Sequence, residues 1–268
     1  MRAVSTIAVI GATGTAGSRV VARLRSRDVA VVEISREQGI DLFSGPDLCE
    51  ALKGVDVAID VSDPVPPEPV DVSQALATAS HNIVGACATQ DVQRLVVPTI
   101  AGIDHPEFDG IPYYEGKRAA KNILLDGPVP TTIVKSTQWY ECATHCDAVS
   151  CDGDEVIVED WLIQPIAADT VADVLVEAAL GQSHTPRTIT GPHPIRLPEL
   201  TSKLLAQQGD SRQVRAVRPA VAALANGVLL ASGHAVVVGP DVDTWLQTLA
   251  PPSIDGHQVA DGEEPSGS

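Results

Sequence analysis

The chain has 268 residues, of which 44% are hydrophobic and only 3% aromatic. A sizeable core can therefore form, built mainly from Val, Ala, Leu and Ile, and wholesale disorder is excluded. The formal net charge of −17 argues against nucleic acid and anionic membranes as partners, because an acidic surface repels phosphate.

The start of the chain leads almost at once into an apolar run at 7–10, without the pattern of a signal peptide. No apolar run reaches the length of about 18 residues that a membrane span needs. The five cysteines are an odd number in a chain of ordinary size, which favours reduced thiols over a disulfide framework. We therefore expect a cytoplasmic protein that does not bind membranes.

Short apolar runs alternate with helical patterns over the first two-thirds of the chain. Strands separated by helices need crossover connections, which predicts an α/β fold with a doubly wound parallel sheet and helices on both faces. The predicted strands are 7–10, 29–34, 55–61, 94–99 and 131–134, and the predicted helices are 17–27, 45–52, 70–89 and 113–125.

The pattern weakens after Trp139, where we expect a smaller lobe over the carboxyl edge of the sheet. Its predicted strands are 156–158, 163–165 and 187–190, and its predicted helices are 169–180 and 198–208. The expected domains are a core at 1–155, a substrate lobe with elements packing back on the core at 156–250, and a disordered acidic tail at 251–268.

A glycine pattern, Gly11-x-x-Gly14-x-x-Gly17, lies between the first predicted strand and the first predicted helix. The first glycine allows a tight turn, the second lets the backbone approach a pyrophosphate, and the third lets helix and strand pack closely. The alternative is a loop with glycines for turn geometry alone. The pattern predicts a dinucleotide site made by Gly11, Thr13, Gly14, Thr15, Ala16 and Gly17.

The end of the second predicted strand indicates which dinucleotide is bound. Ser35 and Arg36 at the strand end suit the 2′-phosphate of NADP, whereas Glu33, inside the strand, would suit the ribose hydroxyls of NAD. We expect NADP(H), with NAD(H) still possible, and Arg36 as a solvated surface charge is the alternative. Further residues expected along the cofactor groove are Asp41, Leu42, Ser62 and Asp63.

Tyr113 and Lys117 are four residues apart on a predicted helix, so they share one face. An ammonium near the phenol would lower the pKa of Tyr113 and let it donate a proton to a carbonyl as hydride arrives. Thr99, at the end of the preceding strand, would polarise the same carbonyl. The alternative is an amphipathic helix that carries an ordinary surface lysine.

Trp139 and Tyr140 follow the last strand of the core, where we expect them to face the substrate; packing between the lobes is the alternative. Four residues nearby raise the possibility of zinc, but their spacings are not those of paired zinc ligands. We expect packed thiols and no metal. These residues are Cys142, His145, Cys146 and Cys151.

From residue 5 to about 215 the chain resembles the atypical short-chain dehydrogenase/reductases, in particular the NmrA-like, NAD(P)H-binding branch. The resemblance implies a Rossmann-type domain, a small C-terminal substrate lobe and a preference for NADP(H), within a branch that mixes reductases, quinone reductase-like enzymes and redox-sensing regulators. At the position where the family usually has a strand-end serine this chain has Thr99, beside Pro98. The stretches that carry the resemblance are 11–17, 96–104, 113–117, 133–141 and 163–169.

The sequence therefore predicts an NADP(H)-dependent oxidoreductase that reduces a carbonyl, a quinone or a conjugated, apolar small molecule. In this hypothesis Tyr113 is the acid, Lys117 orients the ribose, and Thr99 assists by hydrogen bonding. Two alternatives remain. One is a protein that senses NADP(H) without turnover and controls a partner, and the other is a nucleotide-sugar epimerase or dehydratase, which the short C-terminal lobe disfavours.

Overall fold

A computed structural model describes residues 5–64, 71–145, 147–181 and 188–249. Its main sheet has seven strands in the order β12-β9-β5-β4-β3-β1-β2, and every neighbouring pair is parallel. This arrangement confirms the predicted Rossmann-type α/β fold. The strands are β1 (Thr6–Ile10), β2 (Ala30–Ile34), β3 (Val57–Asp60), β4 (Arg94–Ile100), β5 (Thr131–Ser136), β9 (Thr188–Thr190) and β12 (Val236–Val237).

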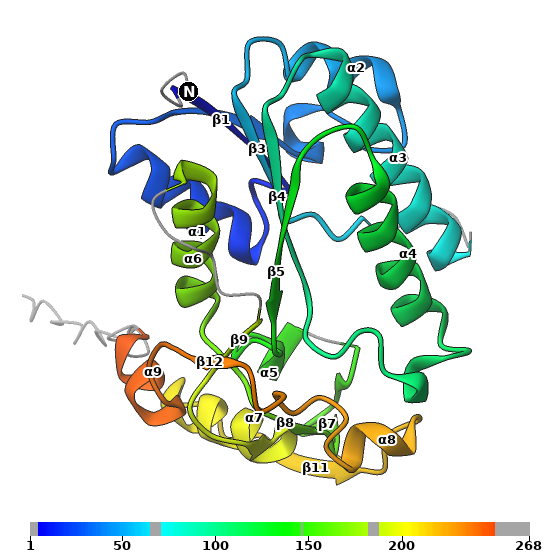
Figure 1. The fold of residues 1–268 in the computed structure, drawn as a ribbon. Helices are drawn as coiled ribbons and strands as arrows, with labels where there is room; N and C mark the ends of the chain where they lie inside the picture. The colour runs from blue at the N-terminus through cyan, green and yellow to red at the C-terminus, as the bar shows by residue number, and fades with distance from the viewer. Residues whose placement is uncertain (1–4, 65–70, 146, 182–187, 250–268) are drawn as a thin grey trace, which may run out of the picture.

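Helices cover both faces of the main sheet (Figure 1). Alternate residues of β1 enter two different core clusters: Ile7 and Val9 pack toward one face, and Ala8 and Ile10 toward the other. A strand buried on both sides needs a continuous apolar run, which explains its sequence. The helices are α1 (Thr15–Arg25) and α6 (Ala168–Leu180) on one face, and α2 (Gly45–Ala51), α3 (Val72–Thr89) and α4 (Pro112–Asp126) on the other.

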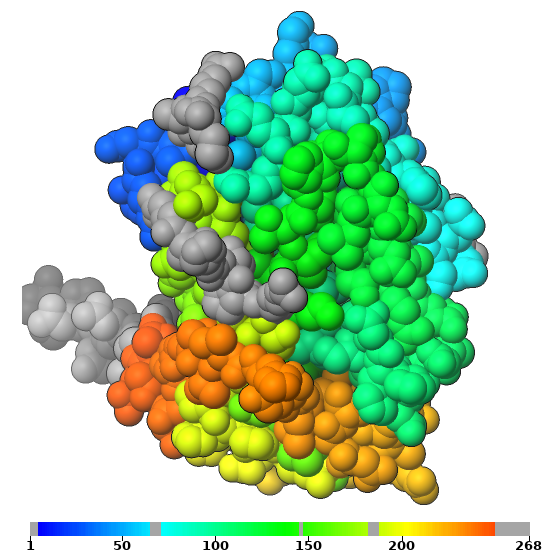
Figure 2. Space-filling view, viewed as in Figure 1, coloured from blue at the N-terminus to red at the C-terminus, as the bar shows by residue number. Residues whose placement is uncertain are grey.

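The remaining elements lie beyond the carboxyl ends of β4 and β5, at the bottom of Figure 1, around a third apolar cluster. The space-filling view shows the C-terminal residues, in orange, closing over this end of the molecule (Figure 2). One small sheet joins β6 (Val149–Asp152), β7 (Glu155–Glu159) and β11 (Gln213–Val217), and another joins β8 (Leu162–Ile163) to β10 (Ile195–Arg196). The short helices here are α5 (Cys142–His145), α7 (Leu197–Gln207), α8 (Ala222–Ala225) and α9 (Val242–Thr248).

The division into domains stays a prediction. The small sheet includes β6, which precedes the expected boundary at 155, while β9 and β12 extend the main sheet. The expected tail at 251–268 lies outside the described residues. Among the described helices, none has both the length and the apolar character needed to span a membrane.

Candidate functional site

The strand order places two loops together at the carboxyl edge of the sheet. From β1 the chain passes through α1 to β2 on one side, whereas β3 pairs with the other side of β1. In open α/β sheets ligands bind where successive connections leave in opposite directions. Here that point lies between residues 11–17, which follow β1, and residues 61–64, which follow β3.

Two of the three glycines are required by the protein's own backbone. Gly11 has φ +83, and a Cβ there would lie 3.0 Å from the Cα and N of Ser62. A Cβ on Gly17 would lie only 1.9 Å from the carbonyl oxygen of Gly11. Gly14 differs: its φ of −75 is open to any residue, and the nearest atom to an added Cβ is 3.3 Å away. A Cβ at Gly14 would therefore be tight against the Gly11 carbonyl oxygen, but far less so than a Cβ at Gly17.

The start of α1 leaves its first amides without a side-chain acceptor. Gly14 is the N-cap and supplies no capping side chain. Its own N–H donates to the Gly11 carbonyl at 3.0 Å, and the amides that follow it in the first turn have no side-chain cap. Thr13, Gly14 and Thr15 are exposed, whereas Ala16 and Gly17 are buried against the sheet. An open helix N-terminus with bare amides fits a diphosphate group.

At the end of β2 the guanidinium of Arg36 is free to bind a ligand, whereas the carboxylate of Glu33 is already paired. Arg36 is exposed and makes no side-chain hydrogen bond or ion pair with the described residues. Ser35 is buried and accepts a hydrogen bond from the Glu37 N–H at 3.2 Å, capping a short 3-10 helix. The carboxylate of Glu33 is ion-paired with Arg25 of α1.

Asp41 and Leu42 shape the turn that leads to α2. The Asp41 carboxylate accepts a hydrogen bond from the Phe43 N–H at 2.9 Å. Leu42 is buried, and its carbonyl accepts from the side-chain amide of Asn82 at 2.9 Å.

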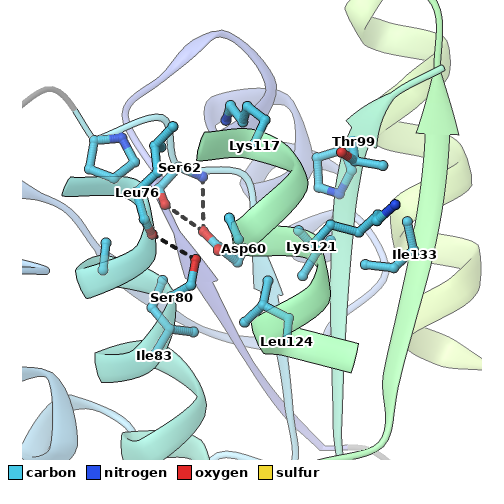
Figure 3. A pocket seen from close by; sticks show the side chains of 15 residues that line it. Asp60, Ser62, Leu76, Ser80, Ile83, Thr99, Lys117, Lys121, Leu124 and Ile133 are labelled. Carbon is cyan, nitrogen blue, oxygen red and sulfur yellow. Dashed lines mark hydrogen bonds between the residues drawn. The ribbon is translucent and has the colours of Figure 1, made fainter. Parts of the chain in front are cut away.

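A buried carboxylate, Asp60, ends β3 beside a cavity of about 40 Å³ (Figure 3). It accepts hydrogen bonds from the Ser62 N–H at 3.0 Å and the Ser62 hydroxyl at 2.7 Å. Burial raises the pKa of Asp60 above its usual value, against the opposing effect of these bonds. On the opposite wall Lys117 and Lys121 come from successive turns of α4. Sequence reasoning missed Asp60, although an acid inside the apolar run 57–61 was a signal.

The predicted tyrosine and lysine are brought together by a third residue. The Tyr113 hydroxyl donates to Asp63 Oδ2 at 3.0 Å, and Lys117 Nζ lies 2.8 Å from Asp63 Oδ1. Lys117 Nζ also lies 5.8 Å from the centre of the Tyr113 ring. The spacing of the two residues predicts that Lys117 lowers the pKa of Tyr113. Instead that pKa is raised, because partial burial and the Asp63 carboxylate both disfavour the phenolate.

Thr99 lines the same cavity as Lys117. Its side chain makes no hydrogen bond within the described residues, so the hydroxyl is available to a ligand. Thr99 is paired in register with Lys135 of β5, and the Lys135 and Lys121 ammonium groups both contact the Asp104 carboxylate. Burial alone would raise the pKa of Asp104, but these lysines hold it below its usual value.

The two aromatic residues after β5 have different surroundings. Trp139 Nε1 donates to the Ser136 hydroxyl at 3.1 Å, and the ring packs beside the cluster under α1 and α6. Tyr140 is only 2% exposed, donates to the Pro240 carbonyl at 3.0 Å, and stacks on Trp245 with ring centres 4.8 Å apart. These contacts are those of the packing alternative for Tyr140.

No group of three or more His, Cys, Asp or Glu side chains is placed to hold a metal in the part of the chain that the structure describes. Cys146 lies outside that part. Cys151 is exposed, and its sulfur accepts from Arg212 at 3.2 Å.

No protein-family model and no curated protein sequence matches the chain significantly. Solved structures do match it. A UDP-N-acetylglucosamine 4-epimerase from Bacillus cereus is 14% identical with TM-score 0.63, covering 91% of this chain and 94% of that one.

Two further structures cover similar shares. A short-chain dehydrogenase/reductase superfamily protein from Agrobacterium tumefaciens with bound NAD is 16% identical, TM-score 0.62, covering 90% of this chain and 95% of that one. The triphenylmethane reductase of Citrobacter sp., complexed with NADP(H), is 16% identical, TM-score 0.58, covering 92% and 96%. At these identities the likeness establishes the fold, which is that of the short-chain dehydrogenase/reductase structures.

Proposed function

We propose that this chain is an NADP(H)-dependent oxidoreductase of the short-chain dehydrogenase/reductase type, which reduces a carbonyl, a quinone or a conjugated small molecule. The observation that carries the proposal is that Tyr113 and Lys117 both contact Asp63. Lys117 lines the cavity together with Ser62, and Ser62 lies against Gly11 of the glycine turn. An acid and a cation at the switch point of a doubly wound sheet suit proton transfer to a substrate that receives hydride.

The described residues fit a dinucleotide. The turn of Thr13, Gly14, Thr15, Ala16 and Gly17 would hold the diphosphate at the uncapped start of α1. Asp41, Leu42, Ser62 and Asp63 would line the groove. Ser35 and the unpaired Arg36 would bind a 2′-phosphate. Glu33, the residue that would select NAD(H), is already paired with Arg25. The Citrobacter structure holds NADP(H) and the Agrobacterium structure holds NAD, so neighbours alone do not decide between them.

When bound, the reduced nicotinamide supplies a hydride; the chain supplies the proton and the orientation. The Tyr113 hydroxyl holds the proton to be donated. Lys117 has three N–H donors and uses one on Asp63, which leaves others for ribose hydroxyls. Thr99 would hydrogen-bond the substrate oxygen that receives this proton. Trp139, on the loop after β5, would face the substrate. Tyr140, which is fully packed, we assign to the core.

One observation favours a second candidate, a protein that binds NADP(H) without turnover. The hydroxyl of Tyr113 is already bound by Asp63, and its pKa is raised. A nucleotide-sugar epimerase also stays open. Because the Bacillus cereus epimerase and this chain each cover more than nine-tenths of the other, the short C-terminal lobe no longer argues against that activity.

Turnover separates these candidates. The full chain is mixed with NADPH and a panel of carbonyls, quinones and triphenylmethane dyes, and NADPH oxidation is followed. In a separate series it is mixed with nucleotide sugars and oxidised NADP or NAD, which can accept the hydride of the sugar, and sugar epimerisation is followed. We expect NADPH oxidation, and a loss of about 10²–10⁴-fold in kcat/KM with Tyr113→Phe. The matched control Tyr114→Phe, one residue along and stacked on Phe108 instead, should retain activity. Tight NADPH binding with no turnover on any substrate would favour the sensor.

A further inference from the structure

A single carboxylate holds both members of the tyrosine–lysine pair. Asp63 comes from the loop after β3, whereas Tyr113 and Lys117 come from the first two turns of α4. One carboxylate oxygen accepts from the Tyr113 hydroxyl at 3.0 Å, and the other faces the Lys117 ammonium at 2.8 Å. The side chain of Lys117 is 20% exposed and that of Asp63 is 54% exposed. The loop thereby contacts α4 across the mouth of the cavity.

We propose that Asp63 is a positioning residue of this pair, which draws the Lys117 ammonium to itself and holds Tyr113 protonated until a substrate oxygen replaces Asp63 as the acceptor of its hydroxyl. The role in catalysis rests on the proposed function; the control of the proton does not. Nothing in the spacing of Tyr113 and Lys117 requires a carboxylate between them.

Hydrogen-bond chemistry fixes the direction of the contact. An ionised carboxylate only accepts, so Tyr113 must carry the hydrogen in this arrangement. A phenolate at the same place would put two anions 3.0 Å apart, which favours the neutral phenol. Within the described ranges, the other groups that face Tyr113 are Lys117 on its own helix, the neighbouring Tyr114, and Cys142 on α5. Lys117 is the one cation among them, and Asp63 neutralises it.

The contact also sets the order of proton movements. The hydroxyl has one hydrogen, so it must turn from Asp63 to the substrate oxygen before it donates. The O–H bond of Tyr113 then breaks as an O–H bond forms on the substrate, and the phenolate left beside Asp63 recovers a proton from solvent. Throughout, Lys117 can stay on Asp63 while its remaining N–H groups bind ribose.

The test is a titration of Tyr113 in the full chain without cofactor. The chain has only three tyrosines, and 3,5-difluorotyrosine is placed at position 113 alone. Its electron-poor phenol ionises at lower pH than tyrosine, which keeps the titration within the range where the protein is folded. Fluorine NMR then follows its ionisation in the parent, in Asp63→Asn and in Asp63→Ala, with folding checked by circular dichroism.

A matched control is available on the same helix. Asp109 pairs with Arg118, the residue after Lys117, at 2.7 Å, so Asp109→Asn removes a comparable carboxylate that does not touch Tyr113. We expect both Asp63 variants to lower the midpoint by about one pH unit or more, and Asp109→Asn to leave it unchanged. Equal midpoints in the parent and both Asp63 variants would overturn the proposal.

Kinetics distinguish failure of this inference from failure of the proposed function. If the parent reduces a substrate, the pH at which its rate falls on the alkaline side should move down in Asp63→Asn, and not in Asp109→Asn. An unmoved profile would count against Asp63. If the parent reduces nothing, the proposed function fails, while the titration still decides whether Asp63 holds the proton.

Discussion

The three glycines of the turn can be separated by experiment, because the protein crowds them to different degrees: an added Cβ would lie 1.9 Å from the nearest atom at Gly17, 3.0 Å at Gly11 and 3.3 Å at Gly14. In Gly17→Ala the new Cβ would stand 1.9 Å from the Gly11 carbonyl oxygen, far inside the 3.0 Å below which real Cβ contacts essentially never occur. Helix α1 must then move away from the turn by more than about 1 Å, and overpacking of this kind costs about 2–3 kcal/mol. For a chain of this size that lowers Tm by roughly 4–6 °C.

Gly14→Ala should behave differently. Its backbone already has φ −75 and ψ 177, and the nearest atom to the new Cβ is 3.3 Å away. Alanine is a poorer N-cap than glycine but restricts the unfolded chain, and the two effects nearly cancel. We expect a stability change within about 0.5 kcal/mol, but NADPH binding weaker by about tenfold or more, because the methyl group occupies space that the diphosphate needs.

Urea unfolding followed by circular dichroism measures the change in stability, and calorimetric titration with NADPH measures the change in affinity. If Gly14→Ala binds NADPH as tightly as the parent, the second glycine does not meet a diphosphate and the assignment of the turn is wrong. If Gly17→Ala is as stable as the parent, the close approach of α1 to Gly11 is wrong.

Three further substitutions test separate parts of the account. Arg36→Ala should weaken the binding of NADPH about 10–100-fold, which corresponds to one charge-assisted hydrogen bond, and change the binding of NADH by no more than about twofold. Equal losses of affinity for the two dinucleotides, measured by calorimetry, would show that Arg36 does not bind the 2′-phosphate. Tyr140→Phe should lower the free energy of unfolding in urea by about 1 kcal/mol, because the hydrogen bond to the Pro240 carbonyl is lost. A change in the KM for substrate as well would indicate that Tyr140 faces the substrate. Because the pKa of Asp60 is raised in the folded protein from 3.8, its ionisation lowers stability as pH rises above about 4. Asp60→Asn should remove that decline and raise the urea midpoint at neutral pH, since its amide oxygen can still accept from Ser62; a lower midpoint would contradict the charge argument.

The fold was predictable because its signals are local and repeated. β1 and β3 are short apolar runs, and some helix boundaries carry turn residues, such as Gly45-Pro46 at the start of α2 and Asp126-Gly127 at the end of α4. The predicted helix 113–125 is observed as Pro112–Asp126. Differences of one or two residues at the ends of elements reflect hydrogen bonds made beyond the apolar run, as where Ser136 extends β5.

The site was predictable only in part, because pairing between distant loops leaves no periodic signal. Tyr113 and Lys117 share a helix face by spacing alone, but Asp63 joins them from 50 residues away. Burial of Tyr113 and that contact together reverse the expected direction of the Tyr113 pKa. The buried Lys121 could have been inferred from its position four residues after Lys117, whereas its partner Asp104 could not.

The central claim is that the chain binds a dinucleotide at the turn between β1 and α1, and amide NMR tests it most directly. The full chain, labelled with nitrogen-15, is titrated with NADPH while its amide resonances are followed. We predict saturable shifts that are largest for residues 13–17 and then for Arg36 and Ser62. No shift at millimolar NADPH or NADH would contradict the account. So would shifts centred on the second cavity, of about 220 Å³ beside Tyr140 and His193.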